Sequence, residues 1–127
     1  MAKKAFTFRG KSLEELKKMD SKEIAPLLTS RARRSLSRGF NDQQKALLKR
    51  IKDGDNNVKT HCRNMVIVPE MLEKTILVHS GKEYQAVQIQ PEMLGHFLGE
   101  FALSRKRVAH SAPGVGATRS SANISVK

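Results

Sequence analysis

Four arginines stand within eight residues of this chain of 127 residues. They are Arg31, Arg33, Arg34 and Arg38, and no acidic residue lies between Glu23 and Asp42 to balance them. A planar guanidinium can grip phosphate oxygens, or the edge of a guanine, through two parallel hydrogen bonds. On a helix, Arg31, Arg34 and Arg38 share one face and Arg33 lies to its side. The pattern predicts a surface for a polyanion; a solvated basic face is the competing interpretation, and a nuclear-localisation signal would use the same residues.

The residues that could support catalysis or bind a metal do not form a recognisable set. The candidates are His61, Cys62, His79 and His96, and a closed zinc site needs more Cys or His than these. The only G-x-G, at residues 114–116, neither follows a strand nor opens a helix, so we do not interpret it as a phosphate loop. We therefore predict no catalytic residue, no metal ion and no cofactor. The histidines are interpreted as packing residues or as contacts to phosphate.

Positive charge is concentrated at the two ends of the chain. Residues 1–58 hold 15 Lys and Arg against 7 Asp and Glu, residues 105–127 hold 5 against none, and residues 59–104 hold 4 against 5. Lys and Arg gain affinity for phosphates by releasing counterions, so the net charge of +12 indicates a polyanionic partner. An anionic membrane is the competing polyanion, but no segment approaches 18 consecutive apolar residues. The single Cys62 suits a reducing interior, so we predict a cytosolic protein with no membrane partner.

The elements that position the arginines are four short helices. Three of them are expected to begin at Leu13, at Asp20 or Ser21, and at Gln43, and the remaining one lies in the stretch 27–40. Ser12 and Glu15 have the spacing of a capping box, and Gly39 is typical of a helix end. Such helices cannot bury much apolar surface alone, so we expect them to need the centre of the chain to pack on.

Residues 59–104 are predicted to form the foldable centre. Residues 75–79 and 84–89 are rich in strand formers, and residues 80–83 between them indicate a hairpin turn. Residues 65–68 predict a buried strand or strand-like turn, ended by a Pro that opens one helical turn. The glycines at 95 and 99 indicate a close backbone approach, either to RNA or to the protein itself.

The predicted fold class is therefore α+β, with a small central β-sheet and short helices packed on it. We expect a single domain in three parts: a basic N-terminal arm and helical extension over residues 1–58, an α+β core over 59–104, and an extended basic tail over 105–127. The Gly- and Ser-rich part of that tail has no apolar period and should become ordered only on a partner.

Several motifs in this centre resemble a known family. They are Ser80-Gly81-Lys82, Ile89, Leu94-Gly95, Leu98-Gly99-Glu100-Phe101 and Ser104, with Lys59-Thr60-His61-Cys62-Arg63 and Pro69-Glu70-Met71 upstream. Together they are similar to the signature of small-subunit ribosomal protein S nineteen, called S fifteen in eukaryotes. Residues 31–39 and 113–121 resemble the archaeal and eukaryotic branch, and the short linker at 53–58 is more similar to archaeal members. The chain departs from the family at Glu73, where Gly is frequent, at Ser80, where Asn is common, and at residues 122–127.

The resemblance implies a structural constituent of the small ribosomal subunit, located on cytoplasmic ribosomes. Family members bind the 3′ domain of the small-subunit ribosomal RNA in the head and pair with ribosomal protein S thirteen. The C-terminal tail is expected to run toward the aminoacyl-site tRNA, near the subunit interface. The alternative, drawn from the N-terminal helices alone, is a DNA- or tRNA-binding regulatory protein.

Thirteen residues are the candidates for RNA contact. They are Arg31, Arg33, Arg34, Arg38, Lys59, Arg63, Lys82, His96, Arg105, Lys106, Arg107, His110 and Arg119.

Overall fold

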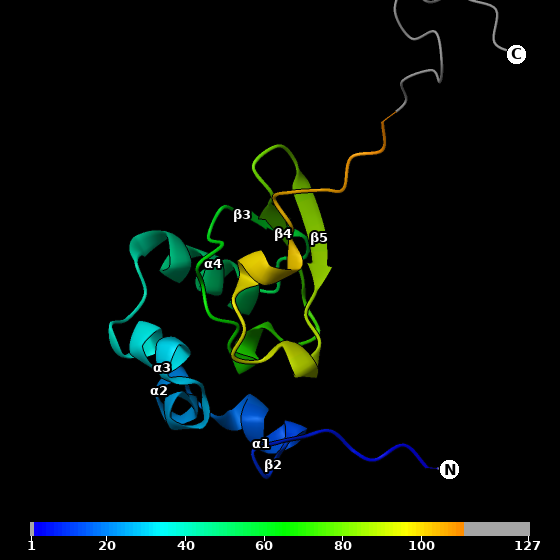
Figure 1. Cartoon of the computed structure of the whole chain (residues 1–127). Helices are drawn as coiled ribbons and strands as arrows, with labels where there is room; N and C mark the ends of the chain where they lie inside the picture. Colours follow the sequence, from blue (N-terminus) through cyan, green and yellow to red (C-terminus); the bar gives the residue numbers. More distant parts are fainter. Residues whose placement is uncertain (1, 111–127) are drawn as a thin grey trace, which may run out of the picture.

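Three strands form the central sheet of the protein, seen in a computed structural model that describes residues 2–110. They are β3 (Val58–Thr60), β4 (Thr75–His79) and β5 (Tyr84–Gln88). The middle strand, β4, pairs antiparallel with β5 and parallel with β3 (Figure 1). The predicted turn is confirmed: the backbone N–H and the hydroxyl of Ser80 donate to the carbonyl of Glu83 at 2.9 and 3.0 Å. Side chains alternate along β5, with Val87 buried and Tyr84 exposed.

The N-terminal part is helical, as predicted. Its elements are α1 (Leu13–Lys18), α2 (Ser21–Ile24), a 3₁₀ turn η1 (Ala25–Leu27), α3 (Ser30–Ser37) and α4 (Asp42–Lys52). The capping box at the start of α1 is formed, because Ser12 N–H donates to Glu15 Oε2 at 2.9 Å and Glu15 N–H donates to Ser12 Oγ at 3.4 Å. A matching box between Asn41 and Gln44 begins α4.

A two-stranded hairpin precedes these helices. Its strands β1 (Thr7–Phe8) and β2 (Lys11–Ser12) are joined by Arg9 and Gly10, both of which have positive φ, as a tight hairpin turn requires. Residues 7 and 8 therefore form a short strand that pairs with the residues leading into α1.

Residues 65–68 form an extended, buried segment that pairs with residues 95–99. Ile67 N–H donates to the His96 carbonyl at 2.8 Å, and Leu98 N–H donates to the Met65 carbonyl at 3.0 Å. Only one bridge of this ladder, Val66 with Phe97, has regular strand geometry. The strand-like interpretation of this segment is thus confirmed. The two Pro-first turns are 3₁₀ helices, η2 (Pro69–Met71) and η3 (Pro91–Met93), and a further one is η4 (Leu98–Phe101).

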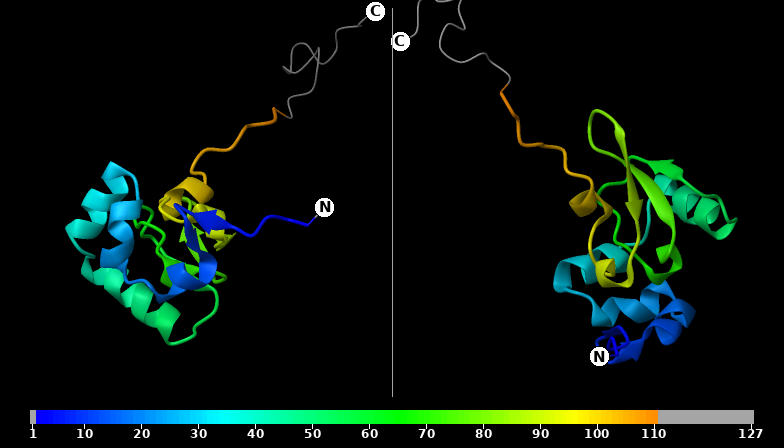
Figure 2. Two further views of the ribbon diagram at one scale, coloured as in Figure 1. Left: turned by 90° about the horizontal axis from the view of Figure 1, so that it is seen from below. Right: turned by 90° about the vertical axis from the view of Figure 1, so that its right-hand side faces the viewer.

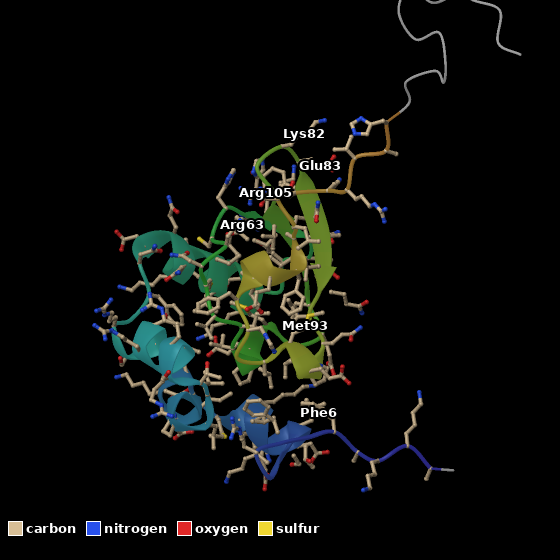
Figure 3. All side chains as sticks on the ribbon, in the orientation of Figure 1. Phe6, Arg63, Lys82, Glu83, Met93 and Arg105 are labelled. Carbon is tan, nitrogen blue, oxygen red and sulfur yellow. The ribbon has the colours of Figure 1, made fainter. Side chains whose placement is uncertain are left out.

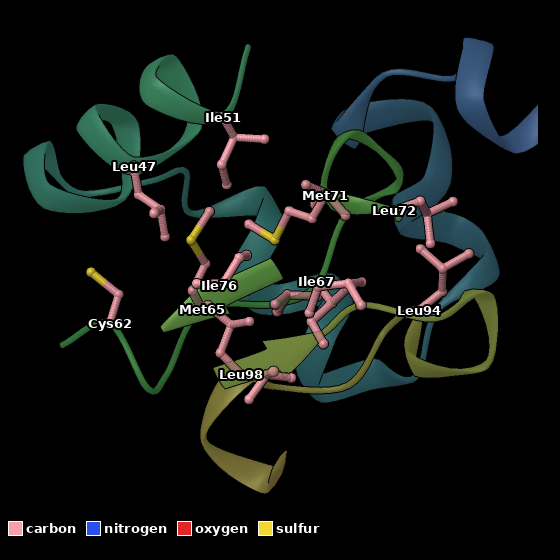
Figure 4. Packing of buried hydrophobic residues seen from close by; sticks show 14 of the residues in the cluster. Leu47, Ile51, Cys62, Met65, Ile67, Met71, Leu72, Ile76, Leu94 and Leu98 are labelled. Carbon is pink, nitrogen blue, oxygen red and sulfur yellow. The ribbon is translucent and has the colours of Figure 1, made fainter. Parts of the chain in front are cut away.

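One hydrophobic core joins the helical extension to the sheet. Leu16, Ile24, Leu28 and Ala32 from the N-terminal elements are each no more than 3% exposed and belong to the same cluster as Ile76 of β4. Figure 4 shows Leu47 and Ile51 of α4 pointing toward Ile76 and Met65. The expectation that the helices need the centre to pack on is confirmed.

Gly95 and Gly99 are close to the protein itself. A Cβ built at Gly95, whose φ is +81°, would lie 2.8 Å from Leu28 Cδ2, and one at Gly99 would lie 2.9 Å from the Arg63 carbonyl oxygen. Of the two alternatives for these glycines, the structure therefore supports packing against protein.

Glu73, where the family often has Gly, adopts a left-handed conformation with φ of +64°. This conformation costs a non-glycine residue about 1–2 kcal/mol, which is a physical reason for Gly at that position. The carboxylate of Glu73 accepts a hydrogen bond from Lys17 Nζ at 3.0 Å, so the side chain ties α1 to the loop before β4.

The β4–β5 hairpin lies at one end of the molecule and α1, α2 and α3 lie at the other, whereas α4 lies beside the sheet (Figures 1 and 2). The chain leaves the core after η4 near the hairpin end, and residues 105–110 have no regular secondary structure. The α+β fold class is confirmed, and residues 111–127 of the predicted tail lie outside the described residues. No helix among the described residues is long and apolar enough to cross a membrane.

Candidate nucleic-acid interface

The four clustered arginines, Arg31, Arg33, Arg34 and Arg38, lie on α3 and at its C-terminal end, and all four are exposed. Within residues 2–110, none of the five ion pairs involves an arginine of this group. Arg33 differs from the others because its Nη2 donates to the Leu28 carbonyl at 3.2 Å, which ties it to the start of the helix. Arg31, Arg34 and Arg38, which share a helical face, are therefore the members best placed to meet a polyanion.

A second group of cations lies at the hairpin end of the molecule. Lys82 is exposed in the hairpin turn, and Figure 3 places Glu83 and Arg105 at the same end of the molecule, with Arg63 below them. Lys106 Nζ donates to Glu83 Oε1 at 2.7 Å, which holds the start of the tail against the turn. A groove lined by the turn and by Leu103, Ser104 and Lys106 runs between them. The fold thus brings Lys82 and the first residues of the tail together.

Glu83 in the hairpin turn has a carboxyl group with a pKa below its ordinary value. The hydrogen bond from Lys106, and then the positive charge of that residue, lower the pKa of the Glu83 carboxyl. A carboxylate that stays charged keeps Lys106 paired, so Lys106 is less available to a phosphate than Lys82 or Arg105.

Arg63 is only half exposed and its guanidinium is used inside the protein. Its Nη1 donates to the His79 carbonyl at 2.8 Å and its Nη2 donates to the Gly99 carbonyl at 2.9 Å. These bonds join the end of β4 to η4. The structure therefore gives this predicted RNA-contact residue a positioning role, which the sequence did not indicate.

Three rings and one lysine meet beside the hairpin. The His61 and His79 rings stack with centroids 4.3 Å apart, and the Tyr84 ring meets both edge-on at 5.5 and 4.8 Å. Lys59 Nζ lies 5.3 Å from the centroid of the Tyr84 ring. Of this group, only Lys59 was among the sequence-predicted contacts. The pairing of His79 with Tyr84 follows from the hairpin register, but the position of His61 requires the parallel pairing of β3 with β4.

His96 lies beside η4 and outside the groove at the hairpin end. Its Nδ1 is 2.7 Å from Glu100 Oε2, and its ring meets that of Phe101 edge-on at 5.9 Å. It also lines a groove with Phe8, Arg9 and Leu27, between the N-terminal hairpin and the core. A carboxylate partner at this distance makes His96 less suited to contact a phosphate than Lys82.

The remaining candidates belong to the tail. Arg107 and His110 are exposed beyond the hairpin end, and Arg119 lies outside the described residues. Within residues 2–110, no group of three His, Cys, Asp or Glu side chains is placed to hold a metal ion.

Comparison with known proteins gives a consistent result. The family model described as ribosomal protein S19 matches residues 34–110. Proteins named small ribosomal subunit protein uS19 are similar over nearly the whole chain. The one from Methanoculleus marisnigri is 49% identical over 96% of this chain and 89% of its own length, and the one from Picrophilus torridus is 50% identical over 98% and 82%. The protein from Methanococcoides burtonii is 48% identical over 96% and 89%. These relatives confirm the predicted similarity to the archaeal branch, and the chain belongs to the ribosomal protein S19 family.

Proposed function

We propose that this chain binds the 3′ domain of the small-subunit ribosomal RNA, in the head of the subunit, through two separate basic surfaces. Membership of the family establishes the general role of the chain. It is a structural, non-enzymatic constituent of the small ribosomal subunit, and it belongs to the ribosome in the cytoplasm. Membership of this family replaces the alternative of a DNA- or tRNA-binding regulator.

The observation that carries the proposal is the placement of the exposed cations. Arg31, Arg34 and Arg38 form one surface on the N-terminal helices, and Lys82 with Arg105 forms the other at the hairpin end. Between them the protein is a hydrophobic core that ties both ends together. Phosphate contacts of this kind fix the orientation of a protein on RNA, and two separated surfaces fix it better than one.

Two further parts of the proposal concern partners. The chain leaves the core at the hairpin end and runs away from it, which supports a tail that reaches toward the aminoacyl-site tRNA near the subunit interface. We also propose contact with ribosomal protein S thirteen. The half-buried apolar residues around the groove that contains Phe8 and Leu27 support a protein neighbour on that side of the molecule.

Binding to RNA transcripts tests the proposal. Purified protein is titrated against a transcript of the 3′ domain of archaeal small-subunit RNA, with a transcript of the 5′ domain as the matched control. We expect tighter binding to the 3′ domain, with an affinity that falls steeply as salt rises, because each phosphate contact contributes about 0.7–0.9 to the log–log slope. Equal affinity for the two transcripts, or binding independent of salt, would contradict the proposal.

A further inference from the structure

The solvent-facing side of the central sheet carries an ordered group of rings. Along β3 and the residue after it, Lys59 and His61 are exposed while Thr60 between them is buried, so the first two point away from the core. In the sheet register Thr60 lies opposite Val78, and His79 lies opposite Tyr84. The chain therefore places His61, His79 and Tyr84 across the three strands at one end of this face. We call these three residues the ring platform.

The rings are held in place by hydrogen bonds. The hydroxyl of Tyr84 lies 2.9 Å from His61 Nε2, and the backbone N–H of Gly81 donates to His79 Nδ1 at 3.0 Å. Because these bonds and the strand register fix the rings before any partner arrives, a planar ligand would meet a formed surface. Preorganisation of this kind lowers the cost of ordering side chains on binding.

Two of the three rings of the platform are open to solvent, and the third, His79, is half-buried. His61 is exposed, and Tyr84 keeps 38% of its surface accessible. The next row along the same face contains Lys59, Leu77 and Ala86, so a cation and two apolar side chains adjoin the rings. No acidic side chain belongs to either row.

We propose that the ring platform binds an unpaired nucleobase of RNA by stacking, while Lys59 contacts the phosphate beside it. This rests on the proposed function, and it names the part of the RNA that this face takes. A phosphate alone would contact the lysine but not the rings. A nucleobase would contact the rings as well, because every nucleobase has a planar face that stacks on an aromatic ring. A sheet surface with exposed rings is suited to single-stranded nucleotides, because paired bases in an RNA helix do not offer their faces.

Two labelled RNAs of equal length and charge test the proposal. The first is a seven-nucleotide uridine oligomer with the fluorescent base 2-aminopurine at its centre, and the second has an abasic site there. Affinity is measured by anisotropy of a terminal dye, and stacking by quenching of the 2-aminopurine fluorescence. We expect the full-length protein to bind the first oligomer about tenfold more tightly than the second and to quench its fluorescence, since stacking contributes at about this level per base.

Variants separate the rings from the charge. Tyr84→Ala and His61→Ala should remove the preference for the oligomer with the central base. Tyr84→Phe, which keeps the ring and loses only the contact of the hydroxyl with His61, should retain most of the preference. Lys59→Ala should weaken binding of both oligomers equally. Circular dichroism confirms that each variant is folded.

Equal affinity for the two oligomers, undetectable binding of both, or a preference that survives Tyr84→Ala and His61→Ala would overturn the proposal. The transcript experiment gives a separate answer. Tight, salt-dependent binding of the 3′ domain without a base preference would leave the proposed function standing and refute the platform. A base preference without binding of the 3′ domain would support the platform and refute the proposed function.

Discussion

Arg63 and Gly99 are joined by two hydrogen bonds, one between their backbones and one from the Arg63 side chain. Gly99 N–H donates to the Arg63 carbonyl at 2.8 Å, and Arg63 Nη2 donates back to the Gly99 carbonyl at 2.9 Å. The approach is so close that a Cβ on Gly99 would lie 2.9 Å from the Arg63 oxygen. This reciprocal contact fixes the segment that leads into the tail against the loop between β3 and β4. It therefore helps to position the first residues of the tail relative to the hairpin.

Arg63→Ala should destabilise the free protein by about 2 kcal/mol, because the carbonyls of His79 and Gly99 would lose a charged donor. Urea unfolding followed by circular dichroism measures the loss. Arg105→Ala is the matched control and should stay within about 0.5 kcal/mol, since Arg105 is exposed. Equal effects from the two substitutions would mean that the bonds of Arg63 do not stabilise the fold.

Ile24→Ala should cost about 2–5 kcal/mol, although the residue belongs to the N-terminal extension, because its side chain is completely buried in the common core. Leu103→Ala removes the same kind of side chain from a position that is 64% exposed, and it should cost about 0.5 kcal/mol or less. Thermal unfolding compares them. If both variants melt like the unchanged protein, the helical extension is not part of the cooperative unit.

Lys106→Ala should raise the pKa of Glu83 toward its ordinary value, because the hydrogen bond from Lys106 is the main cause of the lowered pKa. Since the folded-state pKa lies below the unfolded one, the pair stabilises the protein above the unfolded pKa and is lost as the pH falls through the folded pKa. Carbon-13 NMR titration of the Glu83 carboxyl measures the change. Lys82→Ala should move the same pKa less, because Lys82 acts only through its charge and is the weakest cause. A larger effect from Lys82→Ala would contradict the assignment.

Replacing Arg31, Arg34 and Arg38 together by Ala should weaken binding of the 3′-domain transcript and reduce its log–log salt slope by about 2. Arg33 is left in place because it bonds to the Leu28 carbonyl. The control removes the same charge with Lys17, Lys18 and Lys22 changed to Ala. We expect a smaller loss from the control, because Lys17 is already paired with Glu73. Equal losses would show that only the total charge matters.

Much of this fold could be predicted from local signals. The pair Ser12 and Glu15 predicted where α1 begins, and the strand-forming runs on either side of residues 80–83 predicted the hairpin. Such signals act between residues that are close in the sequence, so their physical effect is readable without the fold. The cap of α4 also explains a residue that the apolar pattern did not predict to be buried. Gln44 is 8% exposed because its side chain turns back to the backbone of Asn41.

The candidate interface was predicted less completely. The sequence identified the exposed arginines of α3 and Lys82 in the hairpin, because charge runs and turns are local features. It did not predict that Arg63 turns inward to two carbonyls, or that His61 stacks on His79. Both depend on the parallel pairing of β3 with β4, which are connected by residues 61–74. A parallel pair has no tight turn whose sequence would predict the pairing.

The sequence by itself determined the charge at the two ends, the starts of α1, α2 and α4, the hairpin and the family, because each depends on residue types at short spacing. The tertiary structure decided which cations face solvent and which are held by the protein, and it assembled the ring platform from three strands. It also decided that Gly95 and Gly99 make room for Leu28 and Arg63. The physical reason is that contacts between segments far apart in the chain are set by packing of the common core, which no short stretch of sequence specifies.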